Sequence, residues 1–179
     1  MIYVALLRGI NVGGNNKVDM KSLKVVFEKA GATQVKTYIN SGNVIFEDAH
    51  SEEKIGAVLE AAIEKHFKIP VRVLIKSLPD IEKIVKKIPD EWQNNTELKC
   101  DVLFLWKDID REEIIKDLPL NPVADEVKYV PGAVLWCIQR SMATKSRISK
   151  IVGTKLYKQI TIRNCNTTRK LYAMMKEIH

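Results

Sequence analysis

Cysteine is scarce in this sequence, and the few cysteines present show no useful spacing. Cys100, Cys137 and Cys165 are odd in number, far apart and without a CxxC motif. A disulfide framework needs pairs of cysteines and a zinc site needs closely spaced ligands, so neither is indicated. We therefore expect three reduced thiols that serve as packing residues.

The N-terminus has no long hydrophobic run. Its apolar stretch, MIYVALLRGI, is too short to span a bilayer. It also lacks the basic front and the small-residue cleavage site of a signal peptide. The chain is therefore predicted to be cytoplasmic and to have no membrane partner.

Residue types suited to catalysis or metal binding are few. Histidine occurs only at His50 in a polar loop, at His66 near a helix end and at the terminal His179. Neither an acid–base group nor a histidine–carboxylate metal site is evident from these positions. Ser41 lies in Asn-Ser-Gly, which is not a nucleophile elbow. No catalytic residue, metal or cofactor is predicted.

Basic residues are in excess, and the excess is confined to the C-terminal part of the chain. The formal net charge is +7, but residues 140–179 hold ten lysines and arginines against Glu177 alone, a balance of +9, so residues 1–139 carry −2. This asymmetry is typical of a surface for nucleic acid or another polyanion. A solvated basic face gives the same pattern, because no compact Lys/Arg run and little aromatic interleaving accompany it.

The first half of the chain has the element order β-α-β-β-α-β. The expected elements are a strand over 2–7, a helix capped by Asp19 and ended by Gly31, two strands around the turn 40–43, a helix from Ser51, and a strand over 71–77. That order is typical of the split βαβ, or ferredoxin-like, sandwich. A further helix from Ser77 and a polar linker over 89–99 follow.

The second half shows the same pattern again. The expected elements are a strand over 100–106, a helix over 110–118 with Asp110 and Glu113 as a capping box, a hairpin over 127–139, a basic helical stretch over 146–152, a strand over 159–163, and a last helix capped by Asn166 or Thr167. We therefore predict an α+β protein of two ferredoxin-like halves, with antiparallel sheets and helices on one face. Their predicted bounds are 1–90 and 98–179.

Three segments resemble a known family. ALLRGINVGG (residues 5–14), YINSGNVIF (38–46) and TIRNCNT (161–167) are similar in kind and order to the motifs of a widespread, mainly bacterial family of unknown function. The resemblance covers essentially the whole chain and implies two ferredoxin-like halves. It implies no activity. Cys165 departs from the family pattern, which has an aromatic residue there.

Polar and basic residues follow the first two strands of the first half. In a split βαβ unit these strands are parallel, so the loop after the first and the hairpin after the second share one end of the sheet. The residues expected at this surface are Arg8, Asn11, Asn15, Asn16, Lys17, Asn40, Ser41 and Asn43. Their chemistry suits anion recognition. Residues 9–17 match neither a Walker A loop nor GxGxxG, and glycines and asparagines can equally serve only to shape the loop.

A second candidate site lies between the last strand and the last helix. Arg163, Asn164 and Arg169 surround the expected helix start, where two guanidinium groups could hold a phosphate or a carboxylate. The predicted function is therefore an anion-binding module for nucleic acid, nucleotide or another phosphate or carboxylate ligand. Two alternatives stay open: an enzyme acting on a small polar substrate at the surface around Arg8, and a protein-interaction or structural role.

Overall fold

The computed structural model describes residues 1–178, so His179 lies outside the described part. The chain forms two compact units. Unit 1 comprises Met1–Ile81 and the residues from Leu171 onward, and unit 2 comprises Glu82–Lys170.

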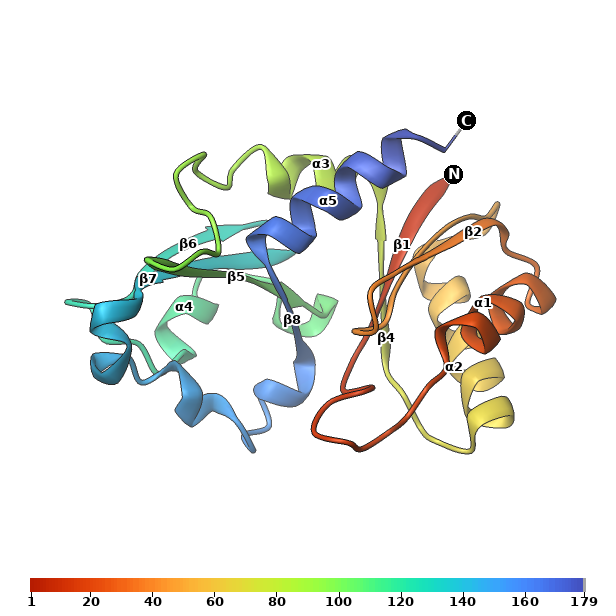
Figure 1. Ribbon diagram of the computed structural model, residues 1–179, viewed down its shortest axis with the longest axis horizontal. Helices are drawn as coiled ribbons and strands as arrows, with labels where there is room; N and C mark the ends of the chain where they lie inside the picture. Colours follow the sequence, from red (N-terminus) through yellow and green to blue (C-terminus); the bar gives the residue numbers. More distant parts are fainter. Residues whose placement is uncertain (179) are drawn as a thin grey trace. The chain divides into compact units, whose positions relative to one another are not determined.

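Unit 1 is a four-stranded antiparallel sheet with two helices on one face. Its elements are β1 (Ile2–Leu7), α1 (Met20–Lys29), β2 (Thr33–Tyr38), β3 (Asn43–Glu47), α2 (Glu52–Phe67) and β4 (Val73–Ser77). The strand order is β2-β3-β1-β4, and Figure 1 shows α1 and α2 on the same side of this sheet. This is the order of the split βαβ sandwich, so the predicted fold of the first half is confirmed.

The core of unit 1 lies between the sheet and its two helices. Tyr3, Ala5 and Leu7 alternate along β1 and belong to this core, as strand geometry requires for one face. Phe27 of α1 packs edge-on against Phe46 of β3, with ring centroids 5.4 Å apart. Val4 and Leu6 on the opposite face of β1 are also buried, and Ile2 is partly buried, which explains why β1 is continuously apolar in the sequence.

Unit 2 repeats the strand order of unit 1. Its strands are β5 (Leu98–Leu105), β6 (Glu126–Val130), β7 (Ala133–Gln139) and β8 (Ile160–Asn164), arranged β6-β7-β5-β8 with antiparallel pairing. A short helix, α4 (Ile114–Asp117), lies between β5 and β6. Helices α3 (Leu78–Val85) and α5 (Cys165–Lys176) have residues in both units. The predicted repetition of the fold is confirmed.

The connections of unit 2 are less helical than the sequence indicates. The basic stretch forms short 3-10 turns instead of a helix: η2 (Arg140–Lys145), η3 (Ile148–Ile151) and η4 (Tyr157–Gln159). Another turn, η1 (Lys107–Ile109), precedes α4. Asp110 does not cap α4, because its Oδ1 accepts hydrogen bonds from Tyr129 Oη (3.0 Å) and Gly132 N (2.8 Å). It therefore ties the β6–β7 hairpin, and the predicted capping box is wrong.

The prediction of three reduced thiols is also wrong. Cys100 of β5 and Cys137 of β7 are directly opposite each other in the sheet and are joined as a disulfide. Strand register brings them together, and sequence spacing contains no information about register. Cys165 is a free, buried thiol. Burial raises the pKa of this thiol to about 12, so it stays protonated near neutral pH.

Candidate functional site

The loop after β1, residues 8–18, has a backbone that glycine and asparagine favour. Gly9, Asn11 and Asn16 have positive φ angles of 71°, 54° and 48°. The Asn11 side chain closes the loop, since its Nδ2 donates to Val18 O (2.9 Å) and its Oδ1 accepts from Val18 N (2.8 Å). Asn16 Nδ2 donates to Gly9 O (2.9 Å). These amides hold the loop in shape.

The loop and the β2–β3 hairpin lie together at one end of the unit 1 sheet. Asn11 Nδ2 also donates to Asn40 O at 2.9 Å, and Leu7 N donates to Gly42 O at 2.9 Å. Asn43 is fully buried, and its Nδ2 donates to Tyr38 O (3.1 Å) and to Ser41 Oγ (2.9 Å). The polar side chains of the hairpin thus bond to one another and to the backbone.

The cations at this end of the sheet differ in exposure. Arg8 is half-buried, and its backbone N donates to Arg72 O at 2.9 Å. Lys17 and Arg72 are exposed. Arg8 and Lys17 thus lie in the same loop, and the backbone of Arg72 bonds to Arg8. Sequence reasoning missed Arg72 because it precedes β4, far along the chain.

In unit 2 the second candidate site is built around the start of α5. Asn164 Oδ1 accepts a hydrogen bond from Thr167 N at 2.8 Å, so Asn164 caps the helix. The predicted caps were Asn166 or Thr167, and that prediction is wrong. Arg163 is buried, and its Nη1 donates to Ile162 O (2.8 Å) and Thr161 Oγ1 (3.2 Å). Burial lowers the pKa of its guanidinium to about 10, so Arg163 remains charged at neutral pH.

Arg169 contacts the linker between the two sheets. Its Nη1 donates to Trp92 O and its Nη2 to Pro89 O, each at 2.7 Å. Asn166 adds two bonds to the backbone of Asn94, at 3.1 Å and 3.0 Å. A guanidinium fork that binds two carbonyls in this way holds a segment in place. Arg169 also borders a polar pocket with Asp90, Gln93 and Asn166.

The basic segment, residues 140–158, is the most cationic part of unit 2. Its lysines and arginines are all exposed: Arg140, Lys145, Arg147, Lys150, Lys155 and Lys158. No aspartate or glutamate occurs between Glu126 and Glu177. Ile151 is buried in the unit 2 core, and Met142, Ile148 and Leu156 pack against it. The segment is thus anchored beneath. Its lysines and Arg147 are exposed, while the Arg140 guanidinium donates to Asn95 O (2.7 Å) and Asn94 Oδ1 (3.3 Å).

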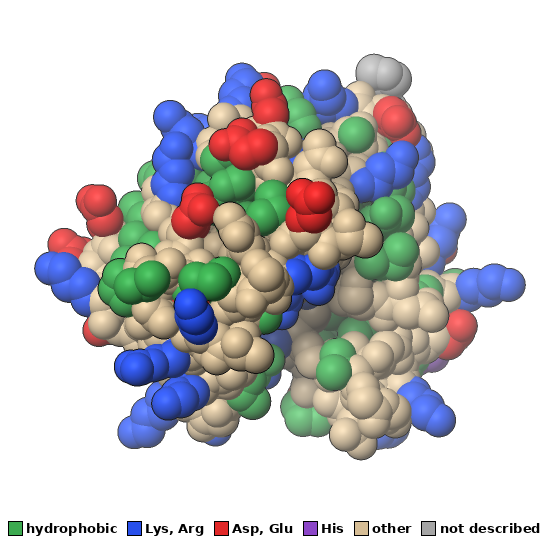
Figure 2. All heavy atoms as spheres, turned by 60° about the vertical axis from the view of Figure 1, so that its left-hand side comes forward, with side chains coloured by type: hydrophobic (Ala, Val, Ile, Leu, Met, Phe, Trp, Pro, Cys, Tyr) green, Lys and Arg blue, Asp and Glu red, His purple; other side chains and the backbone are tan. Residues whose placement is uncertain are grey.

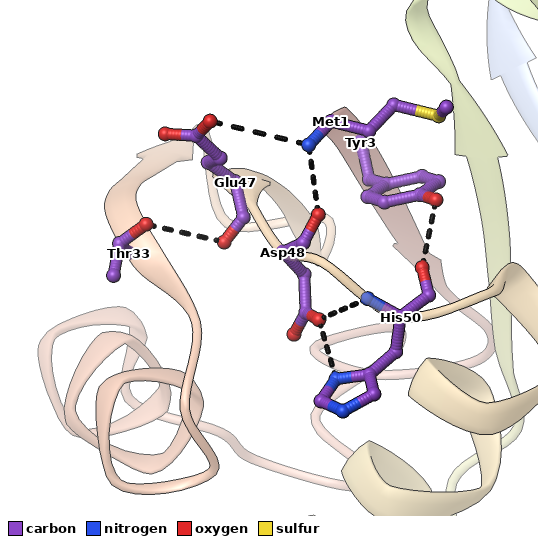
Figure 3. A network of polar contacts seen from close by, with 6 residues as sticks. All are labelled: Met1, Tyr3, Thr33, Glu47, Asp48 and His50. Carbon is purple, nitrogen blue, oxygen red and sulfur yellow. Dashed lines mark hydrogen bonds and ion pairs between the residues drawn. The ribbon is translucent and has the colours of Figure 1, made fainter.

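A polar network that the sequence reasoning passed over lies at the other end of the unit 1 sheet (Figure 3). Asp48 Oδ1 accepts hydrogen bonds from His50 N and lies 2.8 Å from His50 Nδ1. Tyr3 Oη donates to His50 O at 2.9 Å, and the amino group of Met1 donates to Asp48 O at 2.8 Å. Burial alone would raise the pKa of the Asp48 carboxyl, but hydrogen bonds from His50 hold it below the usual value. The signal available in the sequence was the Asp-Ala-His spacing.

Two carboxyl groups form a second cluster in unit 1. Ser77 N donates to Glu52 Oε1 (3.0 Å) and Ser77 Oγ to Asp80 Oδ2 (2.6 Å), so one serine joins both acids. Burial, and then the nearby Asp80 carboxylate, raises the pKa of Glu52, while Lys76 opposes the rise. Perturbed carboxyls of this kind occur at functional sites and also in structural networks. Among residues 1–178, no group of three or more His, Cys, Asp and Glu could hold a metal ion.

Fold and sequence together define the class of protein. The two four-stranded antiparallel sheets and their helices make it an α+β protein of two ferredoxin-like units. Residues 1–136 match the family described as "Protein of unknown function (DUF1697)", and the chain belongs to that family. The resemblance inferred from the sequence motifs is confirmed.

A solved structure resembles this one closely. It is the conserved bacterial protein SP0830 from Streptococcus pneumoniae, with a TM-score of 0.82 and 29% sequence identity over 97% of this chain and 98% of that chain. No curated protein matches the chain. None of the helices within residues 1–178 combines the length and apolar character needed to cross a membrane. Family and relative leave the activity open, so function has to be argued from the chain's own surfaces.

Proposed function

We propose that this protein is an anion-binding module, and that its partner is a polyanion such as nucleic acid bound by the basic segment of unit 2. The observation that carries the proposal is the exposure of six cations in residues 140–158 with no acidic residue among them. Figure 2 turns this side of the molecule forward: several Lys and Arg side chains lie at the lower left of the view, and others are spread over its top and right. Such a patch attracts phosphates and releases their counterions on binding.

The anchoring of the segment supports this proposal. Asn121 Nδ2 donates to Lys145 O at 2.9 Å, and Thr154 Oγ1 donates to Ile151 O at 2.7 Å. Tyr157 N donates in turn to Thr154 Oγ1 at 3.1 Å. Cations on an already ordered backbone lose less conformational entropy on binding than cations on a flexible tail.

The expected mode of binding is contact with phosphates and not with bases. Recognition modules of this fold that bind single-stranded RNA stack bases on exposed aromatic residues of the sheet. Here Phe104 and Trp136, on β5 and β7, are buried, with exposures of 0% and 2%. Binding through the basic segment should therefore depend little on base sequence.

The test is fluorescence anisotropy with labelled nucleic acid duplexes of two unrelated sequences, titrated at several salt concentrations. Replacing Lys145, Arg147 and Lys150 by Gln should weaken binding at least tenfold and reduce the slope of log K against log salt by about 2 to 3. The matched control replaces Lys107, Lys116 and Lys128 by Gln. These lysines are also exposed and in unit 2. Equal losses in both variants, or no binding at low salt, would refute the proposal.

The end of the unit 1 sheet around Arg8 supports a second form of anion binding, for a small phosphate or carboxylate ligand. There Lys17 and Arg72 are exposed, Arg72 O accepts a hydrogen bond from Arg8 N, and Gly13 and Gly14 have exposed backbones with positive φ. Thermal shift with phosphate and with small carboxylates tests it, since a ligand of the native state raises the melting temperature. The rise in melting temperature should disappear in the variants Lys17→Gln and Arg8→Ala. The control variant Lys36→Gln, at an exposed lysine, should retain it.

A further inference from the structure

A groove runs between the solvent-facing sides of α1 and α2 in unit 1. Its floor is apolar and consists of small side chains, Val26 and Ala30 from the α1 end and Val58 and Ala62 from α2. Its rim carries Lys29, Lys65 and His66. The groove is open to solvent on one side and has a volume of ≈ 460 Å³, which lies within the range of small-molecule sites.

The helix sequences explain why this space is open. The larger apolar residues of α2, Leu59 and Ile63, are turned toward the sheet and are buried. The neighbouring face carries Val58 and Ala62, four residues apart and therefore one turn apart on the helix. Val58 is 44% exposed. Alanines at the helix junction leave unfilled a volume that larger side chains would occupy.

The groove continues toward the Asp48–His50 pair. A smaller pocket shares Ala30 and Val58 with it and is further lined by Asp48, His50 and Lys54. The Asp48 carboxylate in that pocket already accepts hydrogen bonds from His50. The continuous lining therefore presents the ammonium groups of Lys29, Lys54 and Lys65 beside an apolar floor.

The nearby glutamates of the two helices do not cancel this charge within the groove. Glu28 lies 3.8 Å from Lys24 on the same helix. Glu60 Oε1 accepts a hydrogen bond from Val73 N at 2.8 Å, so this carboxylate points toward β4. None of the glutamates of α1 and α2 lines the groove or the smaller pocket, and the carboxylate that does is that of Asp48. The site offers an apolar surface together with positive charge.

We propose that this groove binds an anionic amphiphile, a monomeric molecule with an unbranched apolar chain and a terminal carboxylate. The carboxylate lies near Lys29 and Lys65, and the chain follows the floor past Ala30 and Val58 toward the Asp48–His50 end. Charge complementarity selects the anionic headgroup, and the small floor residues select an unbranched chain. This site lies in unit 1 and does not depend on the polyanion surface of unit 2.

Isothermal titration with decanoate, below the concentration at which it forms micelles, tests the ligand class. We expect saturable binding of one molecule per chain. Hexanoate should bind more weakly, by about fourfold for each methylene removed. Decanol should bind at least tenfold more weakly, and decyltrimethylammonium should not bind. Equal binding of all three decyl compounds, or binding only to vesicles of anionic lipid, would overturn the proposal.

Two pairs of variants locate the site. Ala62→Leu fills the groove and should reduce decanoate affinity at least tenfold, whereas Ala61→Leu adds the same volume at an exposed neighbouring position and should leave it unchanged. The double variant Lys29→Gln with Lys65→Gln should weaken the binding of decanoate but not the binding of decanol. The matched control is Lys21→Gln with Lys36→Gln, at exposed lysines outside the groove. The lysine pair keeps the test decisive if Ala62→Leu fails to fold, and equal effects of variants and controls would reject the site.

Discussion

Asn11, in the loop after β1, and Asn43, at the start of β3, show that one residue type can suit two roles. Both were predicted as ligand groups because amides beside glycines suit anion recognition. In the structure their Nδ2 groups donate to backbone carbonyls of Val18, Asn40 and Tyr38. An amide in a loop bonds to whichever backbone groups the fold leaves without partners. The sequence located the loop correctly but could not indicate the direction of these side chains.

Gly42 lies where the β2–β3 hairpin packs against the end of β1 and the loop after it. Its φ is +76°, and a Cβ added there would lie 2.8 Å from Ile10 Cδ1 and 2.8 Å from Leu7 Cβ. Gly42→Ala combines backbone strain with overpacking and should lower the free energy of unfolding by about 2–5 kcal/mol. Urea denaturation measures this loss.

Gly14 provides the control for that substitution. Its φ is +81°, but a Cβ there would have nothing within 4 Å. Gly14→Ala should therefore cost only the backbone strain, about 1–2 kcal/mol. If the two alanine variants are equally stable, the close contact of the hairpin with the loop is not a constraint on the fold.

At the scale of elements, Arg169 connects α5 with the linker before β5. Removing its guanidinium leaves the carbonyls of Pro89 and Trp92 without their 2.7 Å donors. Arg169→Ala should lower the free energy of unfolding by about 1–3 kcal/mol. Lys170→Ala, at the exposed neighbouring position, should change it little. A loss of nucleic acid affinity without a loss of stability would instead assign Arg169 to the binding surface.

The pairing of β5 with β7 predicts how many thiols can be alkylated. Cys100 and Cys137 are joined, and Cys165 is buried with a pKa of about 12. Native protein should therefore react slowly with iodoacetamide, because the thiolate is the reactive species. Unfolded protein should take up one label without reductant and three with it, as measured by intact mass. Three labels without reductant would show that the cysteines are reduced.

The sequence predicted strands better than connections, for a physical reason. Strand positions follow from apolar runs and from turn residues such as those at 40–43, which are local signals. The basic connection was predicted to contain a helical stretch over 146–152. Gly153 and the packing of Ile151 into the core instead favour short 3-10 turns. The cap at Asn164 and the arginine contacts depend on partners distant in sequence, which local patterns do not specify.

For the whole molecule, the two units share a topology but differ in surface chemistry. The strand order is equivalent in both sheets. Unit 1 uses full helices for its two connections and so creates the groove between α1 and α2. Unit 2 replaces the second helix by 3-10 turns that carry the exposed cations. The connections between strands therefore carry the groove of unit 1 and the basic segment of unit 2.

The pH dependence of stability should reveal two carboxyls with opposite behaviour. Asp48 has a pKa below its usual 3.8 in the folded state. The ionised Asp48 carboxylate therefore stabilises the folded state fully at pH values above the pKa that Asp48 has in the unfolded state. This stabilisation is lost as the pH falls through the pKa that Asp48 has in the folded state. Asp48→Asn should therefore be less stable than the wild type at pH 7, and the difference should shrink as the pH falls below about 4. Chemical denaturation at pH 3, 4 and 7 checks this trend, and a difference that does not vary with pH would exclude it.

Glu52 should show the reverse trend, because its folded pKa lies above the usual 4.5. The folded state binds the Glu52 proton more tightly than the unfolded state does. The contribution of Glu52 to wild-type stability therefore falls as the pH rises from the pKa of Glu52 in the unfolded state through its pKa in the folded state. Glu52→Gln keeps an oxygen that can accept Ser77 N and removes the repulsion from Asp80. The variant should gain stability relative to the wild type between pH 4 and pH 7, by no more than about 1 kcal/mol because Glu52 is partly solvated. A relative gain that decreases with rising pH, as measured by urea denaturation, would show that Lys76 outweighs burial and Asp80 at this carboxyl.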